Sequence, residues 1–258
     1  MIELPYLMVL VEALIEFESQ VNTHKNAILP YYNNRYFTTI GNAFQIVTQH
    51  CHSMDLQPRL FLENYLENNP FLYILTPAAR HKKGAIWAKK SISLKQSFSI
   101  RVLVNCVPSQ EIYAADGFCF VLQTQGLQAL GNDGNQTGYG GIQGNSLAVR
   151  VNTYYDDFFE IGQHLRLCKN GNIQELIGGL KTIPTNTLIS DNTFHEMEYY
   201  WNAQKATFSI SFEGELIESY KLDLSELFNQ EEVYWGFTAS TGDCYALHAV
   251  YIQSVEFF

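Results

Sequence analysis

Basic residues are scarce in this chain of 258 residues. Lysine and arginine together number 16, against 26 aspartate and glutamate residues, which gives a formal net charge of −10. A nucleic-acid surface needs clustered basic side chains to neutralise phosphates. The one basic cluster, in residues 80–90, is typical of a solvated turn beside a strand, with phosphate binding as the alternative. We therefore expect no nucleic-acid partner.

Long apolar runs are also lacking. The most apolar stretch, residues 1–17, is interrupted by Glu3, Glu12 and Glu16 and is shorter than the roughly 20 apolar residues that span a bilayer. Neither a basic segment before it nor a small-residue cleavage site after it is present, so it is not a typical signal peptide, and cytoplasmic residence and signal-independent export both stay open. We expect residues 1–30 to form a helical extension that docks on the domain, with a partner or membrane surface as the alternative.

Motifs of the common catalytic classes are missing as well. The chain has no GxSxG nucleophile elbow, no phosphate-binding loop and no HExxH motif. Glu213, Glu215 and Glu218 are the one suggestive acidic cluster, and they flank a predicted hairpin turn, where alternation places them on a solvated face. We therefore expect a protein that is not an enzyme, and we keep glycoside hydrolysis by paired carboxylates as a less favoured alternative.

Cysteine occurs without the spacing of a disulfide framework or a zinc site. The five cysteines are an odd number, and they favour reduced, packed thiols. Cys119 alternates with Phe118 and Phe120 inside an expected strand, where packing is the natural role.

Short strand-like segments separated by Asn, Gly and Pro make up most of the chain. Residues 98–107 alternate so that one face is apolar, and residues 207–212 and 216–222 form a hairpin pattern. Roughly a dozen such segments predict an all-β fold, a β-sandwich of antiparallel sheets over residues 31–258. Further strands are expected at 35–47, 71–75, 85–89, 164–168, 196–201, 233–239 and 247–258, with a helical insertion at 60–66 and a loop at 178–184.

Residues 114–157 contain the best candidate for a functional site. Two apolar runs, residues 118–122 and 147–151, flank a glycine-rich segment, which predicts two strands joined by a loop. Oxygen-bearing side chains gather at the ends of these strands, where sites are usually built on a rigid sheet. They are Asp116, Asn152, Asp156, Asp157 and Glu160.

Six segments, taken in this order, resemble the legume-type (L-type) lectins, and in particular their bacterial relatives. They are LTPA with GAIW (75–87), ADGFCFVLQ (115–123), GYGGI (138–142), SLAVRVNTYYD (146–156), YYWNA (199–203) and WGFTASTG (235–242). The resemblance implies a jelly-roll sandwich that binds glycans or glycoproteins in a shallow loop site without chemical turnover. A homo-oligomer is left open. The alternative function is a protein-interaction domain that has lost sugar binding.

The resemblance also implies a set of sugar-binding residues. In the family, the aspartate of the ADG segment binds sugar hydroxyls from a cis peptide, which corresponds here to Ala115-Asp116. A glycine-rich loop that donates a backbone N–H matches residues 131–138, and a selectivity loop matches residues 242–245. An aromatic face against the apolar side of a sugar ring is expected from Tyr155 or Tyr245. The expected carbohydrate-binding set is Asp116, Gly134, Asn135, Tyr155, Asp156, Gly242, Asp243 and Tyr245.

The metal-binding run departs from the family pattern. Where the family has Glu-x-Asp-Thr-Tyr-x-Asn, residues 150–156 read RVNTYYD, so Arg150 stands in place of the first acid. A guanidinium cannot be a ligand, and we expect no transition metal, with Arg150 supplying its own charge there and His164 as the unused nitrogen ligand. Calcium tolerates varied oxygen ligands. The expected calcium ligands are Asn152, the Tyr154 carbonyl, Asp156 and Glu160. A loop without any metal, in which Arg150 pairs with Asp157 or Glu160, is equally open.

Overall fold

The computed structural model describes residues 44–49, 72–108, 114–154, 163–182 and 189–258. The helical extension predicted for residues 1–30 and the helical insertion predicted at 60–66 lie outside these ranges. So do Tyr155, Asp156 and Glu160 of the predicted site.

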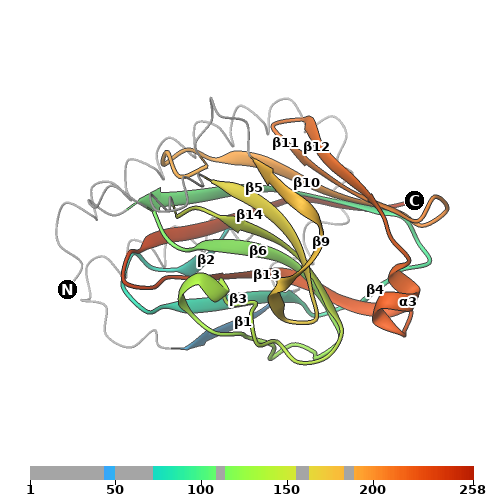
Figure 1. Cartoon of the computed structure of the whole chain (residues 1–258), viewed down its shortest axis with the longest axis horizontal. Helices are drawn as coiled ribbons and strands as arrows, with labels where there is room; N and C mark the ends of the chain where they lie inside the picture. Colours follow the sequence, from blue (N-terminus) through green and yellow to red (C-terminus); the bar gives the residue numbers. More distant parts are fainter. Residues whose placement is uncertain (1–43, 50–71, 109–113, 155–162, 183–188) are drawn as a thin grey trace.

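Two antiparallel sheets face each other and form a β-sandwich, as the sequence predicted (Figure 1). The first sheet has the order β1 (Phe44–Gln49), β3 (Lys83–Ala88), β13 (Glu232–Ser240), β6 (Gly117–Gln123), β7 (Ser146–Asn152), β8 (His164–Lys169) and β9 (Asn172–Thr182), and β4 (Ile92–Ser93) pairs with β13. The second sheet has the order β12 (Glu215–Lys221), β11 (Thr207–Phe212), β10 (His195–Asn202), β5 (Phe98–Pro108), β14 (Ala246–Phe257) and β2 (Leu72–Thr76).

Aromatic side chains join the two sheets at the centre of the sandwich. Phe120 of β6 stacks on Tyr199 of β10, with ring centroids 4.1 Å apart, and meets the edge of Phe237 of β13 at 5.5 Å. Strand β10 alternates strictly between buried and half-buried residues because successive side chains point to opposite faces. The inward residues of both sheets thus form one core.

The outer face of the first sheet is covered by the glycine-rich loop, residues 124–145. Trp87 of β3 donates from Nε1 to the Ala129 carbonyl at 2.8 Å, and the Tyr139 hydroxyl hydrogen-bonds to Ser146 Oγ at 3.1 Å. Every residue of β6 and β7 is therefore buried, on both faces, which explains why these strands are continuous apolar runs in the sequence. The Tyr139 side chain of this loop is fully buried and offers no exposed face to a ligand.

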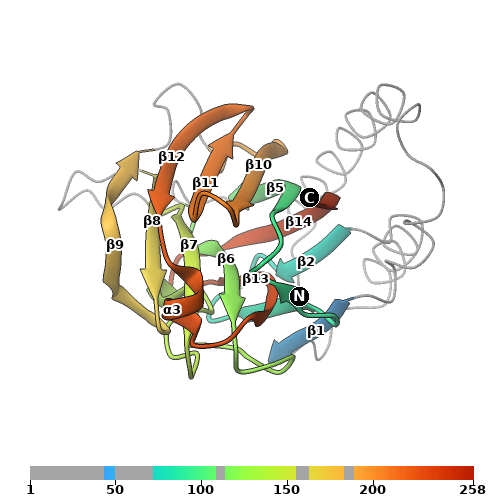
Figure 2. The ribbon, with the colours of Figure 1, turned by 90° about the vertical axis from the view of Figure 1, so that its right-hand side faces the viewer.

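Some features differ from the sequence-based expectations. The predicted loop at 178–184 is wrong at its start, because β9 continues through Gly178 and Gly179, with irregular pairing to β8. A short helix, α3 (Leu224–Phe228), was not predicted; it follows the β11–β12 hairpin (Figure 2). The Asp223 side chain accepts a hydrogen bond from the Glu226 N–H and caps this helix.

Cys106, Cys119, Cys168 and Cys244 are free thiols, and the first three are buried, which confirms the predicted packing role for the cysteines that the structure describes. Within the described ranges, no helix combines the length and the apolar character needed to cross a membrane.

Candidate functional site

Asp116 lies at the start of β6, on the edge of the sandwich where three loops meet. The Ala115–Asp116 peptide bond is cis, as the resemblance implied. The Asp116 N–H donates to the Ser240 carbonyl at 3.0 Å, and its carbonyl accepts from the Thr153 N–H at 3.1 Å. The backbone of Asp116 is thus fixed to residues at the ends of two neighbouring strands, β13 and β7.

The Asp116 carboxylate lies next to Gly242, which also lies close to Gly134. A Cβ placed on Gly242 would be 3.0 Å from Asp116 Oδ2 and 3.4 Å from the Gly134 Cα, so the three residues converge on one small space. Oδ2 is buried and accepts no hydrogen bond from the described residues. Buried polar atoms are nearly always partnered, and an exception of this kind marks a place where a ligand donor fits.

Hydrogen bonds around Ser240 and Thr241 join the three loops. The Gly134 N–H donates to the Thr241 carbonyl at 3.1 Å, and Ser240 Oγ donates to the Gly134 carbonyl at 2.7 Å. On the other side, the Thr241 N–H donates to the Lys82 carbonyl at 2.8 Å, and Thr241 Oγ1 donates to the Ala79 carbonyl at 2.6 Å. The loops 78–82, 131–138 and 240–245 therefore act as one unit around Asp116.

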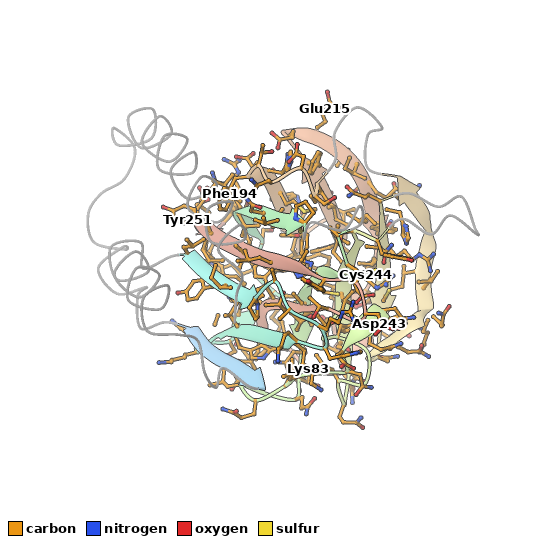
Figure 3. The ribbon with its side chains drawn as sticks, turned by 90° about the vertical axis from the view of Figure 1, so that its left-hand side faces the viewer. Lys83, Phe194, Glu215, Asp243, Cys244 and Tyr251 are labelled. Atoms are coloured by element: carbon orange, nitrogen blue, oxygen red, sulfur yellow. The ribbon has the colours of Figure 1, made fainter. Side chains whose placement is uncertain are left out.

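Ionisable side chains form the rim of this unit. His81 lies between two carboxylates, with Nδ1 3.6 Å from Asp133 Oδ2 and Nε2 3.4 Å from Asp243 Oδ1. Figure 3 shows Asp243 and Cys244 on the same face of the molecule as Lys83, whose Nζ donates to the Gly131 carbonyl at 2.8 Å. The sequence assigned His81 to a solvated turn and did not single out Asp133, because no local pattern brings residues so far apart in the chain together.

Burial raises the pKa of the Asp116 carboxyl to about 6. The positive charge of Arg150 opposes this rise, and the negative charges of Asp133 and Asp243 add to it. The carboxylate is therefore ionised at neutral pH and takes up a proton under mildly acidic conditions.

Arg150 lies on β7 beneath the glycine-rich loop and is only 5% exposed. Its Nη2 donates to the Asn135 carbonyl at 2.8 Å and to Asn152 Oδ1 at 3.1 Å. The Asn152 Nδ2 in turn donates to the Tyr154 carbonyl at 2.7 Å. Burial lowers the pKa of Arg150, yet an arginine side chain keeps its charge in proteins. One buried cation thus ties the loop to the end of β7.

The structure brings together part of the predicted sugar-binding set. Asp116, Gly134 and Gly242 converge, and Asp243 lies at the rim with its side chain 92% exposed. The Asn135 side chain is exposed and accepts from Gln136 Nε2, while its backbone carbonyl is the one that contacts Arg150. Tyr245 is half-buried, next to the first residue of β14.

The predicted metal ligands are described only in part. The Asn152 side chain donates a hydrogen bond to the Tyr154 carbonyl, whereas Asp156 and Glu160 lie outside the described residues. Among the residues that the structure describes, no group of three or more His, Cys, Asp or Glu side chains is arranged to hold a metal ion.

The acidic residues that motivated the hydrolase alternative belong to another part of the sandwich. Glu213 Oε1 lies 3.0 Å from His195 Nδ1, and Glu218 pairs with Lys181. Glu215 lies at the tip of the β11–β12 hairpin, away from Asp243 (Figure 3). Two of these carboxylates are thus engaged with basic side chains.

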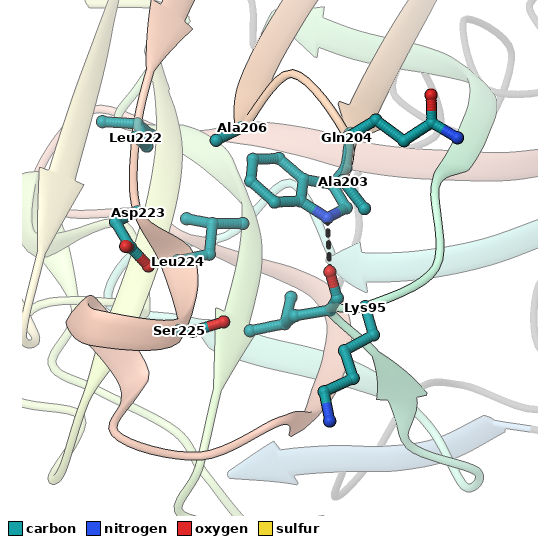
Figure 4. A pocket seen from close by; sticks show the side chains of 10 residues that line it. Lys95, Ala203, Gln204, Ala206, Leu222, Asp223, Leu224 and Ser225 are labelled. Atoms are coloured by element: carbon teal, nitrogen blue, oxygen red, sulfur yellow. Dashed lines mark hydrogen bonds between the residues drawn. The ribbon is translucent and has the colours of Figure 1, made fainter.

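A separate groove of about 370 Å³ lies near α3. Its lining includes Lys95, Asp223 and Trp201, whose Nε1 donates to the Leu94 carbonyl at 2.8 Å (Figure 4). Leu94 follows β4, which pairs with the first residues of β13, whereas Asp116 contacts Ser240 at the other end of β13. The groove and the Asp116 site are therefore at opposite ends of one strand.

Solved structures with the same fold include two proteins with a bound sugar. The lectin from Bauhinia forficata in complex with GalNAc has a TM-score of 0.62 at 14% identity, covering 86% of this chain and 95% of that chain. The exoplasmic/lumenal domain of VIP36 in a Ca²⁺/Man3GlcNAc-bound form has a TM-score of 0.57 at 15% identity, covering 83% of this chain and 85% of that chain.

Sequence comparisons extend the likeness from fold to family. The chain is 27% identical over 210 residues to the L-type lectin-domain containing receptor kinase V.7 of Arabidopsis thaliana. The matched segment covers 71% of this chain and 31% of that protein. The chain therefore spans about a third of the length of this relative. These matches do not support the narrower expectation of bacterial relatives. The sequence profile of the legume lectin beta-barrel domain matches residues 32–254. The chain belongs to the family of L-type lectin domains.

Proposed function

We propose that this protein binds glycans without chemical turnover, at a loop site centred on Asp116. The observation that carries the proposal is the buried carboxylate oxygen, Asp116 Oδ2, which has no donor among the described residues and lies beside Gly134 and Gly242. Membership of the L-type lectin family supports it, as do the GalNAc and Man3GlcNAc complexes of proteins with this fold.

The chemistry of the site suits a sugar. A carboxylate accepts hydrogen bonds at both oxygens, so Asp116 can hold two neighbouring hydroxyls of a pyranose ring. The Gly134 N–H already donates to Thr241, and we therefore assign the backbone donor role to the next residue, Asn135. The roles of Tyr155, Asp156 and Tyr245 stay predictions from the resemblance.

A glycan array probed with the full chain tests the proposal. We expect selective binding to a subset of glycans, and we expect Gly242→Ala to weaken that binding, because the added Cβ lies 3.0 Å from Asp116 Oδ2. Gly179→Ala is the matched control, since a Cβ at that position meets nothing within 4 Å. An array without any bound glycan would reject the proposal in favour of the interaction-domain alternative.

Glycan affinity should fall as the pH drops through about 6. Protonation converts Asp116 from an acceptor at both oxygens into a group that carries a proton on one of them, and the pKa of this carboxyl is about 6. One pH unit below the pKa only about a tenth of the molecules keep the carboxylate, so binding should weaken roughly tenfold. Titration calorimetry between about pH 5 and pH 7.5 measures the affinity. An affinity that does not change over this pH range would contradict the prediction.

The pH dependence of folding stability that comes from Asp116 should be opposite to that of glycan affinity. The pKa of Asp116 in the folded chain, about 6, is above its ordinary value of 3.8, so its contribution to stability is fully present below that ordinary value and is lost as the pH rises through about 6. His248, whose pKa is lowered to about 3 by burial, adds a pH dependence of the other sign. Comparing wild type with Asp116→Asn at each pH cancels that contribution.

A further inference from the structure

The resemblance to metal-binding lectins predicts that a metal ion stabilises this site, whereas the contacts of Arg150 indicate that this side chain does so. A cation held by Asn152 and the Tyr154 carbonyl has to contact both oxygens. Asn152 Oδ1, however, accepts from the Arg150 guanidinium, and Asn152 Nδ2 points its N–H at the Tyr154 carbonyl oxygen, 2.7 Å away. The hydrogen bond between the two predicted ligands occupies the place where a shared cation would sit.

The positive charge of Arg150 also disfavours a bound metal ion. Calcium lies about 2.3–2.6 Å from its oxygen ligands, and Asn152 Oδ1 is 3.1 Å from Arg150 Nη2, so a calcium ion on this oxygen would be within about 6 Å of a fixed positive charge. A second arginine, Arg166, lies opposite Arg150 on β8 and adds to that charge. The described residues therefore do not fit a divalent cation.

Arg150 itself makes the contacts that a structural cation would make. Its guanidinium is buried, it fixes the Asn135 carbonyl in the glycine-rich loop, and it orients the Asn152 side chain at the end of β7. Its positive charge also favours the ionised form of Asp116, the carboxylate at the centre of the site. The loop, the strand end and the carboxylate are thus all linked to one side chain.

We propose that Arg150 is the resident cation of this site, so that the loop is ordered and glycans are bound without calcium or any transition metal. Arg150 is a positioning residue, which acts through Asn135, Asn152 and Asp116. Only the part of this inference that concerns glycans rests on the proposed glycan binding, because the order of the loop can be measured without a ligand.

Metal dependence is tested first on the full chain without sugar. Protein freed of metal with chelator is compared with protein in excess calcium and in excess manganese, by native mass spectrometry and by thermal unfolding. We expect no bound metal at stoichiometric level and one unfolding midpoint in all conditions. A midpoint that falls with chelator or rises with calcium would overturn the inference, whether or not any glycan binds.

Loop order is tested with Arg150→Met, using Arg101→Met as the control. Arg101 is on β5 of the other sheet, where it pairs with Glu198, so the control removes the same charge at a distance. We expect amide hydrogen exchange in residues 134–138 to become about 10- to 100-fold faster in Arg150→Met only, the factor for losing hydrogen bonds from a charged donor. Unchanged protection of this loop would contradict the proposed role.

Glycan affinity completes the test. With the best ligand from the array, the wild type should bind equally well in chelator and in calcium, and Arg150→Met should bind about 10- to 100-fold more weakly in both. Arg150→Lys, which keeps the charge, should retain part of the affinity. Calcium-dependent binding by the wild type would reject metal independence while leaving the proposed glycan binding intact.

Discussion

Replacing Asp116 by asparagine should abolish glycan binding and leave the unfolding midpoint unchanged or higher. The substitution removes the charge that strengthens two hydrogen bonds to the ligand, and a loss of more than about 100-fold in affinity follows if both are weakened. It also removes a carboxylate whose burial raises its pKa, so the folded chain loses an unfavourable charge. Binding sites commonly sacrifice stability in this way.

Calorimetric titration and thermal unfolding of the same preparations check both halves of this prediction. Glu215→Gln, an identical acid-to-amide change on the exposed β11–β12 hairpin, is the control and should alter neither quantity. Retained binding by Asp116→Asn would remove Asp116 from the centre of the site. A large drop in its midpoint would show that the carboxylate is structural.

Replacing Phe120 by alanine should destabilise the fold by about 3–5 kcal/mol, the usual range for a buried phenylalanine. Phe120 is 1% exposed and contacts Tyr199 and Phe237, so its loss opens a cavity between the two sheets. Chemical denaturation measures the free energy of unfolding. Leu216→Ala, at a position that is 64% exposed, should change it by less than about 0.5 kcal/mol. A small effect at Phe120 would mean that the core is not centred on this aromatic cluster.

The strands could be predicted from the sequence because burial follows local alternation. Residues 98–107 and 207–212 match β5 and β11 closely. The apolar runs at 118–122 and 147–151 also marked strands, although their continuous character reflects a loop on one face and the core on the other. The short helix α3 was missed because a single turn gives little periodicity to detect.

The site was only partly predictable. Asp116 and the glycine-rich loop followed from the strand pattern, and the family resemblance added the cis bond before Asp116, which is present. The hydrogen bond from the Lys82 N–H to Thr241 Oγ1 joins residues 159 positions apart, and no local sequence pattern predicts such a contact. His81 and Asp133 were missed for the same reason, whereas Arg150 was noticed only because it breaks a motif.

The most direct test of glycan recognition at Asp116 is a crystal structure of the full chain with the best array ligand. We expect two sugar hydroxyls within hydrogen-bonding distance of the Asp116 carboxylate, in the space beside Gly134 and Gly242. A sugar bound elsewhere, such as the groove of Trp201 near α3, with the space at Asp116 empty, would contradict the account.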